Sequence, residues 1–138
     1  MSYLAKIARP MLMHAATSHC MQVAKVLIVE DDKRLADTVG DLLSSFGHNV
    51  EVAYDGPEAL SVVEPFEPHI VFLDLSLPTL TGFEVARQIR EMCGRAVRLV
   101  AYTGWADLMT RPISSFGFDA VLVKPATLDQ ILKVMGNE

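Results

Sequence analysis

The sequence predicts an α/β protein in which a doubly wound, five-stranded parallel sheet lies between two layers of helices. From Lys25 onward, short apolar runs alternate five times with segments of helical periodicity. This alternation is typical of βα units on a mostly parallel sheet. Residues 26–29 and 70–73 are apolar on both faces, so these two runs are expected to be central strands, covered by helices on both sides.

The strands are expected at residues 25–30, 49–53, 69–74, 97–102 and 120–123. The run at 49–53 alternates apolar and polar residues, which is typical of an edge strand. The strand order that follows is 2-1-3-4-5. In this order the chain reverses direction between the first and third strands, and ligands of such sheets bind at the carboxyl ends of the flanking strands.

The helices are expected at residues 33–46, 57–64, 82–93, 105–116 and 128–135. Gly47 follows the first helix at the position of a left-handed C-cap. Thr127 and Gln130 form a capping-box pattern at the start of the last helix. Pro112 lies inside the fourth segment, so two short helical pieces are expected there.

Length and charge limit the possible functions. A chain of 138 residues suits one domain, assigned to residues 25–138, and residues 1–24 are expected to form a loosely ordered extension. A helix over residues 3–16 that docks on this or a partner domain is the alternative. The net charge is −5, although the first 24 residues carry two basic residues and no acid. This balance argues against direct binding of nucleic acid.

The N-terminal apolar patch is too short to span a bilayer and is interrupted by Pro10, His14 and His19, so no membrane partner is expected. The two cysteines, Cys20 and Cys93, have neither metal-ligand spacing nor the density of a disulfide scaffold. A reducing compartment, and therefore the cytoplasm, is the expected location.

Polar residues close four of the expected strands. Glu30 and Asp31 end the first strand, Asp74 ends the third, Thr103 follows the fourth and Lys124 follows the fifth. Carboxyl ends of parallel strands meet at one edge of the sheet, so these side chains are expected to lie together. Acid, hydroxyl and amine groups in one place suit a divalent cation and a phosphoryl group.

Four motifs contain these residues: VLIVEDD at 26–32, VFLDLSLP at 71–78 with Gly82 following, AYTG at 101–104 and VKP at 123–125. Together, and in this spacing, they resemble the receiver domain of two-component response regulators. The resemblance covers residues 25–136. It implies the flavodoxin-like receiver fold, a three-layer αβα arrangement.

The resemblance implies a Mg²⁺ site. Asp31 would bind the ion directly, Glu30 through water, and Asp74 and the backbone carbonyl of Ser76 would supply further oxygens. Oxygen ligands in an octahedral arrangement are those that Mg²⁺ prefers. Asp32 is expected to cap the first helix instead.

The resemblance also implies phosphoryl chemistry. Asp74 would accept the phosphoryl group, Lys124 would neutralise the developing charge, and the Thr103 hydroxyl would hydrogen-bond the attached group. The donor would be a histidine on a kinase or phosphotransfer protein, and the output a downstream protein target. Beyond its own phosphorylation and dephosphorylation, no enzyme activity is expected.

Several positions depart from the family pattern. Val121 replaces an aromatic residue that often takes part in signalling, and Thr81 replaces an acidic or amide residue in what is interpreted as loop variation.

The Lys124–Pro125 bond is often cis in the family. Trp105 is expected at the mouth of the site, where its ring would shield the phosphoryl group from water.

Three other classes of protein share parts of this pattern. A pseudo-receiver that binds a partner without phosphorylation keeps the fold but loses the acids or the lysine, all of which are present here. A haloacid-dehalogenase-type phosphatase needs a second acid two residues after the nucleophile, and Ser76 occupies that position. A dinucleotide-binding domain needs a glycine-rich fingerprint after the first strand, which this chain lacks.

Overall fold

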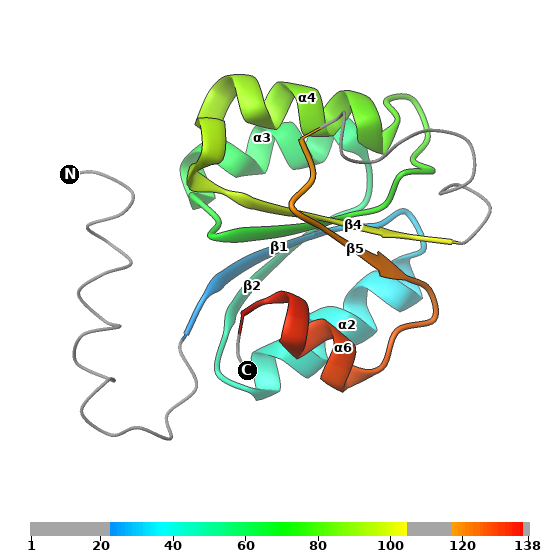
Figure 1. Cartoon of the computed structure of the whole chain (residues 1–138). Coiled ribbons are helices and arrows are strands. Elements are labelled where there is room, and N and C mark those ends of the chain that lie inside the picture. The colour runs from blue at the N-terminus through cyan, green and yellow to red at the C-terminus, as the bar shows by residue number, and fades with distance from the viewer. Residues whose placement is uncertain (1–22, 105–116, 137–138) are drawn as a thin grey trace.

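The computed structural model describes residues 23–104 and 117–136, which form one parallel sheet covered by helices on both faces (Figure 1). The strands are β1 (Lys25–Val29), β2 (Asn49–Ala53), β3 (Ile70–Leu73), β4 (Arg98–Thr103) and β5 (Ala120–Val123). The helices are α2 (Lys33–Ser45), α3 (Gly56–Phe66), α4 (Gly82–Cys93) and α6 (Leu128–Val134), with a short 3-10 helix η1 (Gly94–Ala96). The strand order is β2-β1-β3-β4-β5, as predicted.

The strands are in parallel register, which brings their carboxyl ends level. Val29 lies opposite Ala53 on one side and Leu73 on the other. Backbone hydrogen bonds continue this ladder by one residue, because the Glu30 N–H donates to the Ala53 carbonyl and the Asp74 N–H to the Val29 carbonyl, both at 3.0 Å. The residues that follow β1 and β3 are therefore fixed side by side.

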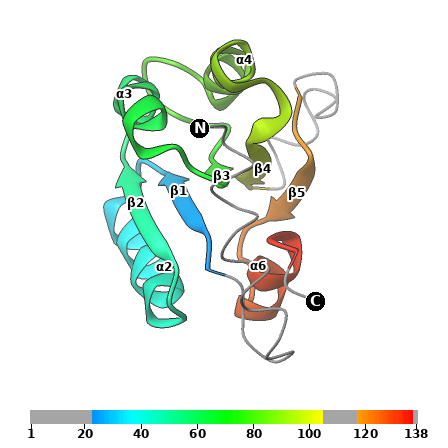
Figure 2. The same ribbon diagram turned by 90° about the vertical axis from the view of Figure 1, so that its left-hand side faces the viewer.

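Two apolar cores lie on the two faces of the sheet. One fills the space between the sheet and the α3 and α4 layer, and the other lies under α2 and α6 (Figures 1 and 2). Successive strand residues alternate between them, so that Leu27 and Val29 belong to the first core and Val26 and Ile28 to the second. All residues of β3 are buried, which confirms its predicted central place.

Side-chain caps define the helix starts. Asp32 accepts a hydrogen bond from the Leu35 N–H at 3.2 Å, which confirms its capping role, and the Thr127–Gln130 capping box is formed. The Thr81 side chain caps the start of α4, so this residue, which was interpreted from the sequence as loop variation, has a structural role.

The helix predicted at 57–64 is longer in the structure and continues through Pro65 to Phe66. Proline in this last turn removes one backbone hydrogen bond, and the packing of Phe66 against the core favours the continuation. β4 extends through Thr103, beyond the predicted end at 102. Gly47 has a φ of 92°, as expected of a left-handed C-cap.

The remaining predictions concern residues outside the described ranges. These are residues 1–22 of the extension expected at 1–24, the helix expected at 105–116 with its break at Pro112, and the position of Trp105. Within residues 23–104 and 117–136, every helix is too short or too polar to cross a membrane.

Candidate functional site

The predicted polar residues meet at the carboxyl edge of the sheet. Glu30 and Asp74 follow the central strands β1 and β3, Thr103 ends β4 and Lys124 follows β5. Glu30, Asp74 and Thr103 are at most 4% exposed, whereas Asp31 is open to solvent. The Lys124 N–H donates to the Thr103 carbonyl at 2.9 Å, which fixes the backbone of Lys124 beside β4.

The acids form one cluster. Glu30, Asp31 and Asp74 each place a carboxylate oxygen within 4.8 Å of the others. Backbone N–H groups hold two of these carboxylates, since Asp32 donates to Glu30 at 3.1 Å and Ser76 donates to Asp74 at 3.0 Å. A set of hard oxygen donors in a partly buried position fits Mg²⁺.

Lys124 connects the acids electrostatically. Its ammonium contacts a carboxylate oxygen of Glu30 closely and lies 3.2 Å from an Asp74 oxygen. The ammonium also lies 5.2 Å from the centre of the Tyr102 ring. Lys124 contacts two carboxylates of a cluster of three, so the cluster has more acidic groups than this one lysine can balance, and a divalent cation would balance the remainder.

Burial governs the ionisation of this cluster. Burial, together with the charge of Asp74, raises the pKa of Glu30 to about 7, although hydrogen bonds from Lys124 and the Asp32 N–H act to lower it. Burial acts to lower the pKa of Lys124, but the hydrogen bond to Glu30 and the charge of Asp74 outweigh it and raise that pKa. The lysine stays protonated and stabilises negative charge at the site.

The loop that follows Asp74 is packed against the start of α4. The Gly82 N–H donates to the Leu75 carbonyl at 3.0 Å. A Cβ atom at Gly82 would lie 2.2 Å from the Asp74 carbonyl oxygen and 2.6 Å from Leu75 Cα. Only glycine fits this close approach, and the contact sets the path of the chain through Asp74 and Ser76.

The structure gives the positions of the site residues that were predicted from the sequence. The structure brings Glu30, Asp31 and Asp74 together and puts Lys124 in contact with two of them. Thr103 is buried at the end of β4. Ser76, two residues after Asp74, is exposed at the same edge.

Two further positions can be compared with the family pattern. The Lys124–Pro125 bond is cis, as it often is in the family. Val121, at the position where the family often carries an aromatic residue, is 39% exposed on the edge strand β5.

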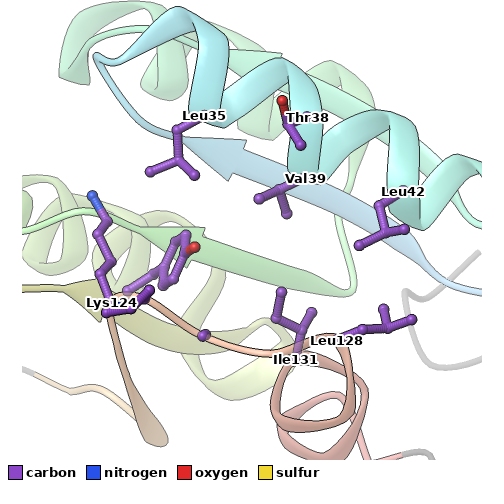
Figure 3. A pocket seen from close by; sticks show the side chains of 10 residues that line it. Leu35, Thr38, Val39, Leu42, Lys124, Leu128 and Ile131 are labelled. Carbon is purple, nitrogen blue, oxygen red and sulfur yellow. The ribbon is translucent and has the colours of Figure 1, made fainter.

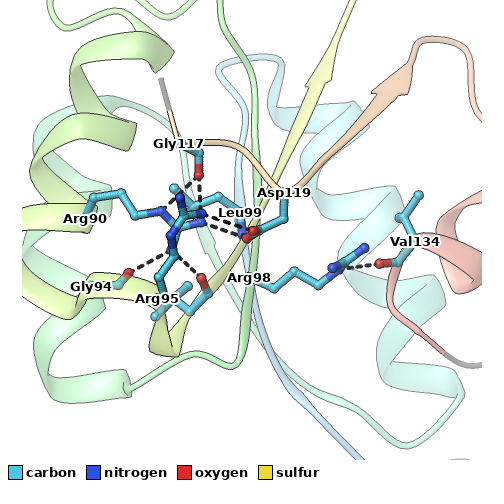
Figure 4. Close-up of polar contacts among 9 residues, drawn as sticks. Arg90, Gly94, Arg95, Arg98, Leu99, Gly117, Asp119 and Val134 are labelled. Atoms are coloured by element: carbon cyan, nitrogen blue, oxygen red, sulfur yellow. Dashed lines mark hydrogen bonds and ion pairs between the residues drawn. The ribbon is translucent and has the colours of Figure 1, made fainter. Parts of the chain in front are cut away.

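Nothing in the sequence indicated the role of Arg90, which connects segments at the amino ends of the strands, at the edge of the sheet opposite the candidate site (Figure 4). Arg90 donates to the carbonyls of Gly94, Val97 and Gly117, at distances between 2.6 and 2.9 Å, and forms an ion pair with Asp119 at 2.7 Å. The Asp119 carboxylate also accepts the Leu99 N–H at 2.9 Å. Arg90 thus joins α4 to the segments that directly precede β4 and β5, and no sequence motif indicates it.

A groove lies between α2 and α6 (Figure 3). Its volume is about 470 Å³. Leu35, Val39 and Leu42 line one wall from α2, Leu128 and Ile131 contribute from α6, and Lys124 stands at one end. The groove is mainly apolar, and it joins the acidic cluster at the lysine.

The fold and the site define a class of signalling domain, and the chain belongs to it: residues 26–135 match the response regulator receiver domain family. It is 33% identical over 113 residues to the response regulator MprA of Mycobacterium avium, covering 80% of this chain and 49% of that protein. The MprA of Mycolicibacterium vanbaalenii is 34% identical, with 80% and 48% covered. The chain thus spans about half the length of these curated relatives.

Solved structures agree with this assignment. The chemotaxis response regulator CheY4 of Vibrio cholerae superposes with a TM-score of 0.75 at 28% identity, covering 83% of this chain and 97% of that one. A CheY-like receiver domain protein from Methanospirillum hungatei gives a TM-score of 0.74 at 26% identity, with 83% and 91% covered.

Proposed function

We propose that this receiver domain is phosphorylated on Asp74 in a Mg²⁺-dependent reaction. The phosphoryl donor is a histidine kinase or a histidine phosphotransfer protein, and the phosphorylated domain signals to a downstream protein target. Family membership supports the signalling role. The observation that carries the residue-level proposal is the contact of Lys124 with both Glu30 and Asp74 inside the acidic cluster.

In this proposal Asp74 is the nucleophile. One of its carboxylate oxygens attacks phosphorus, the bond from phosphorus to the donor nitrogen breaks, and the electron pair leaves with the histidine ring. The Ser76 N–H holds one Asp74 oxygen in place, at 3.0 Å, and leaves the other on the side of Lys124. Lys124 then stabilises the negative charge of the phosphoryl oxygens.

Glu30, Asp31, Asp74 and the Ser76 carbonyl are the proposed holders of Mg²⁺. A bound divalent cation supplies charge screening between the attacking carboxylate and the anionic phosphoryl group. Two residues of the chain have further roles: the Asp32 N–H orients Glu30, and the buried Thr103 provides a hydroxyl for the transferred group. Asp31 is exposed, so it is accessible to a cation from solvent.

The proposal treats the domain as a switch and not as an enzyme with a separate substrate. A pseudo-receiver is not favoured because the three acids cluster at the site and the lysine contacts two of them. A dehalogenase-type phosphatase is not favoured because Ser76 lacks the carboxylate needed for acid–base catalysis. The cytoplasm is part of the proposal, since receiver phosphorylation depends on kinase domains that use cytoplasmic nucleotide.

Phosphorylation of the full chain by a small acyl phosphate tests the proposal. Intact-mass spectrometry should show one added phosphoryl group in the presence of Mg²⁺ and much less after chelation, and the group should be released by hydroxylamine. Asp74→Ala should abolish the addition, whereas Asp129→Ala, an exposed carboxylate on α6, should leave it unchanged. Full labelling of Asp74→Ala would refute Asp74 as the acceptor.

A further inference from the structure

A tyrosine lies directly under the lysine of the proposed site. Tyr102 is the residue before Thr103 in β4, and its ring centre is 5.2 Å from the Lys124 ammonium. The face of an aromatic ring is electron-rich, and it attracts an ammonium group most strongly where water is excluded. Tyr102 is 4% exposed, so this contact is largely desolvated.

The position of the Tyr102 ring is fixed by its neighbours. It meets the Phe72 ring edge-on, with centroids 6.4 Å apart and an angle of 78° between the planes. In the sheet, Tyr102 pairs with Leu122, two residues before Lys124. The ring is therefore held by a central strand on one side and by the partner strand of Lys124 on the other.

The other contacts of the ammonium are of a different kind. Lys124 is bound by Glu30 and Asp74, and both carboxylates belong to the cluster that would hold a cation. A carboxylate that binds a divalent cation attracts the Lys124 ammonium less strongly. The Tyr102 ring has no such competing role, because the face of the ring is not a metal ligand.

We propose that Tyr102 is a positioning residue for Lys124. The ring holds the ammonium at the carboxyl edge when the carboxylates are engaged elsewhere, so that the ammonium remains directed at the incoming phosphoryl group. This inference rests on the proposed phosphorylation of Asp74. It gives a role to a residue of the AYTG motif for which the sequence indicated none, and Tyr102 acts through Lys124.

The test compares Tyr102→Leu, which removes the ring, with Tyr102→Phe, which keeps it. Val26→Ala is the matched control, since it removes a buried apolar side chain from the same core at the opposite end of the sheet, level with Arg98 of β4. Tyr102→Leu should slow phosphorylation by an acyl phosphate by about 2- to 30-fold, the range that corresponds to a cation–π contact. Tyr102→Phe should stay close to wild type, and so should Val26→Ala under conditions where it is folded.

A second measurement needs neither Mg²⁺ nor phosphorylation. In the metal-free protein, the NMR signals of the Lys124 ε-methylene group should be shifted upfield by the ring, and this shift should persist in Tyr102→Phe and vanish in Tyr102→Leu. In a Lys124→Met background, Tyr102→Leu should cause no further loss of phosphorylation rate, because the group it positions is gone.

The outcomes separate the two levels of the proposal. If the wild-type protein is not phosphorylated, the proposed function fails, and the NMR measurement still tests the contact. If the wild-type protein is phosphorylated and Tyr102→Leu is no slower than Val26→Ala, the positioning role is refuted. Equal losses from Tyr102→Leu in the presence and absence of Lys124 would also refute it, since the ring would then act on the fold alone.

Discussion

Gly82→Ala should destabilise the protein and disturb the site at the same time. The added Cβ would lie 2.2 Å from the Asp74 carbonyl oxygen, 2.6 Å from Leu75 Cα and 2.9 Å from the Asp74 carbonyl carbon. These contacts are far inside van der Waals distance, and all three atoms belong to the backbone, so no side-chain rotation can relieve them. Overpacking of this kind costs about 1–3 kcal/mol, and the backbone contacts place Gly82→Ala at the upper end, about 3 kcal/mol.

Gly40→Ala is the matched control. Its Cβ would meet Val52 Cγ2 at 3.2 Å, which is a movable methyl group. Gly40 lies inside α2, where alanine is favoured over glycine by about 1 kcal/mol, so the net change should remain within about 1 kcal/mol of wild type.

Urea unfolding followed by circular dichroism measures both variants. With a urea dependence of about 2 kcal/mol per molar, a loss of 3 kcal/mol lowers the unfolding midpoint by about 1.5 M. Mg²⁺ binding should weaken in Gly82→Ala and be unchanged in Gly40→Ala, because only the first displaces the backbone of Asp74. A Gly82→Ala midpoint indistinguishable from wild type would refute the close approach on which this reasoning rests.

Three further predictions follow from the structure. Asp31→Ala should weaken Mg²⁺ binding at least about tenfold by calorimetry, since an anionic ligand is lost, whereas Asp37→Ala on α2 should not; equal affinities would exclude Asp31 as a ligand. Arg90→Met should lower the free energy of unfolding by about 2–4 kcal/mol, because Asp119 loses its ion pair with Arg90 and several carbonyls lose their donor. Arg87→Met, whose ion pairs are exposed, should cost less than about 1 kcal/mol, and similar losses of the two variants in urea unfolding would contradict the anchoring role of Arg90. Burial lowers the pKa of His48, whose Nδ1 accepts the Ala24 N–H at 3.1 Å, so the stability from this neutral histidine is present above its unfolded pKa of 6.5 and is lost as the pH falls through the lower folded value. His48→Gln should therefore lose less stability than wild type between about pH 7 and 5. Parallel curves of unfolding free energy against pH for the two proteins would refute this role of His48.

The sheet order was predictable because the apolar pattern reports burial directly. Residues 26–29 and 70–73 have no polar face, which a strand can tolerate only at the centre of a sheet covered on both sides. The alternating strand at 49–53 is indeed the edge strand β2. Helix ends were predictable where a local signal exists, as at Gly47, Asp32 and Thr127.

Pro65 shows where local signals fail. The helix was expected to end at residue 64, just before the proline, but α3 continues past it to Phe66. Phe66 packs against a core that is built from several elements, and such contacts are not visible in the local sequence.

The candidate site was predictable to a similar extent. The acids and the lysine stand at strand ends in a characteristic spacing, and the parallel register brings them together without any further information. Tyr102 and Arg90 were not predictable, because each acts through a partner far away in sequence. A tyrosine in an apolar strand and an arginine in a helix are ordinary residues until the fold shows what they contact.

The position of the phosphoryl group is the most direct test of the central claim. The 138-residue chain is treated with an acyl phosphate and Mg²⁺, the aspartyl phosphate formed on the protein is reduced with borohydride, and the peptides are sequenced by mass spectrometry. We expect homoserine in place of the aspartate at position 74, with Glu30, Asp31 and Asp32 unmodified. Reduction at one of those three acids with position 74 intact would contradict it.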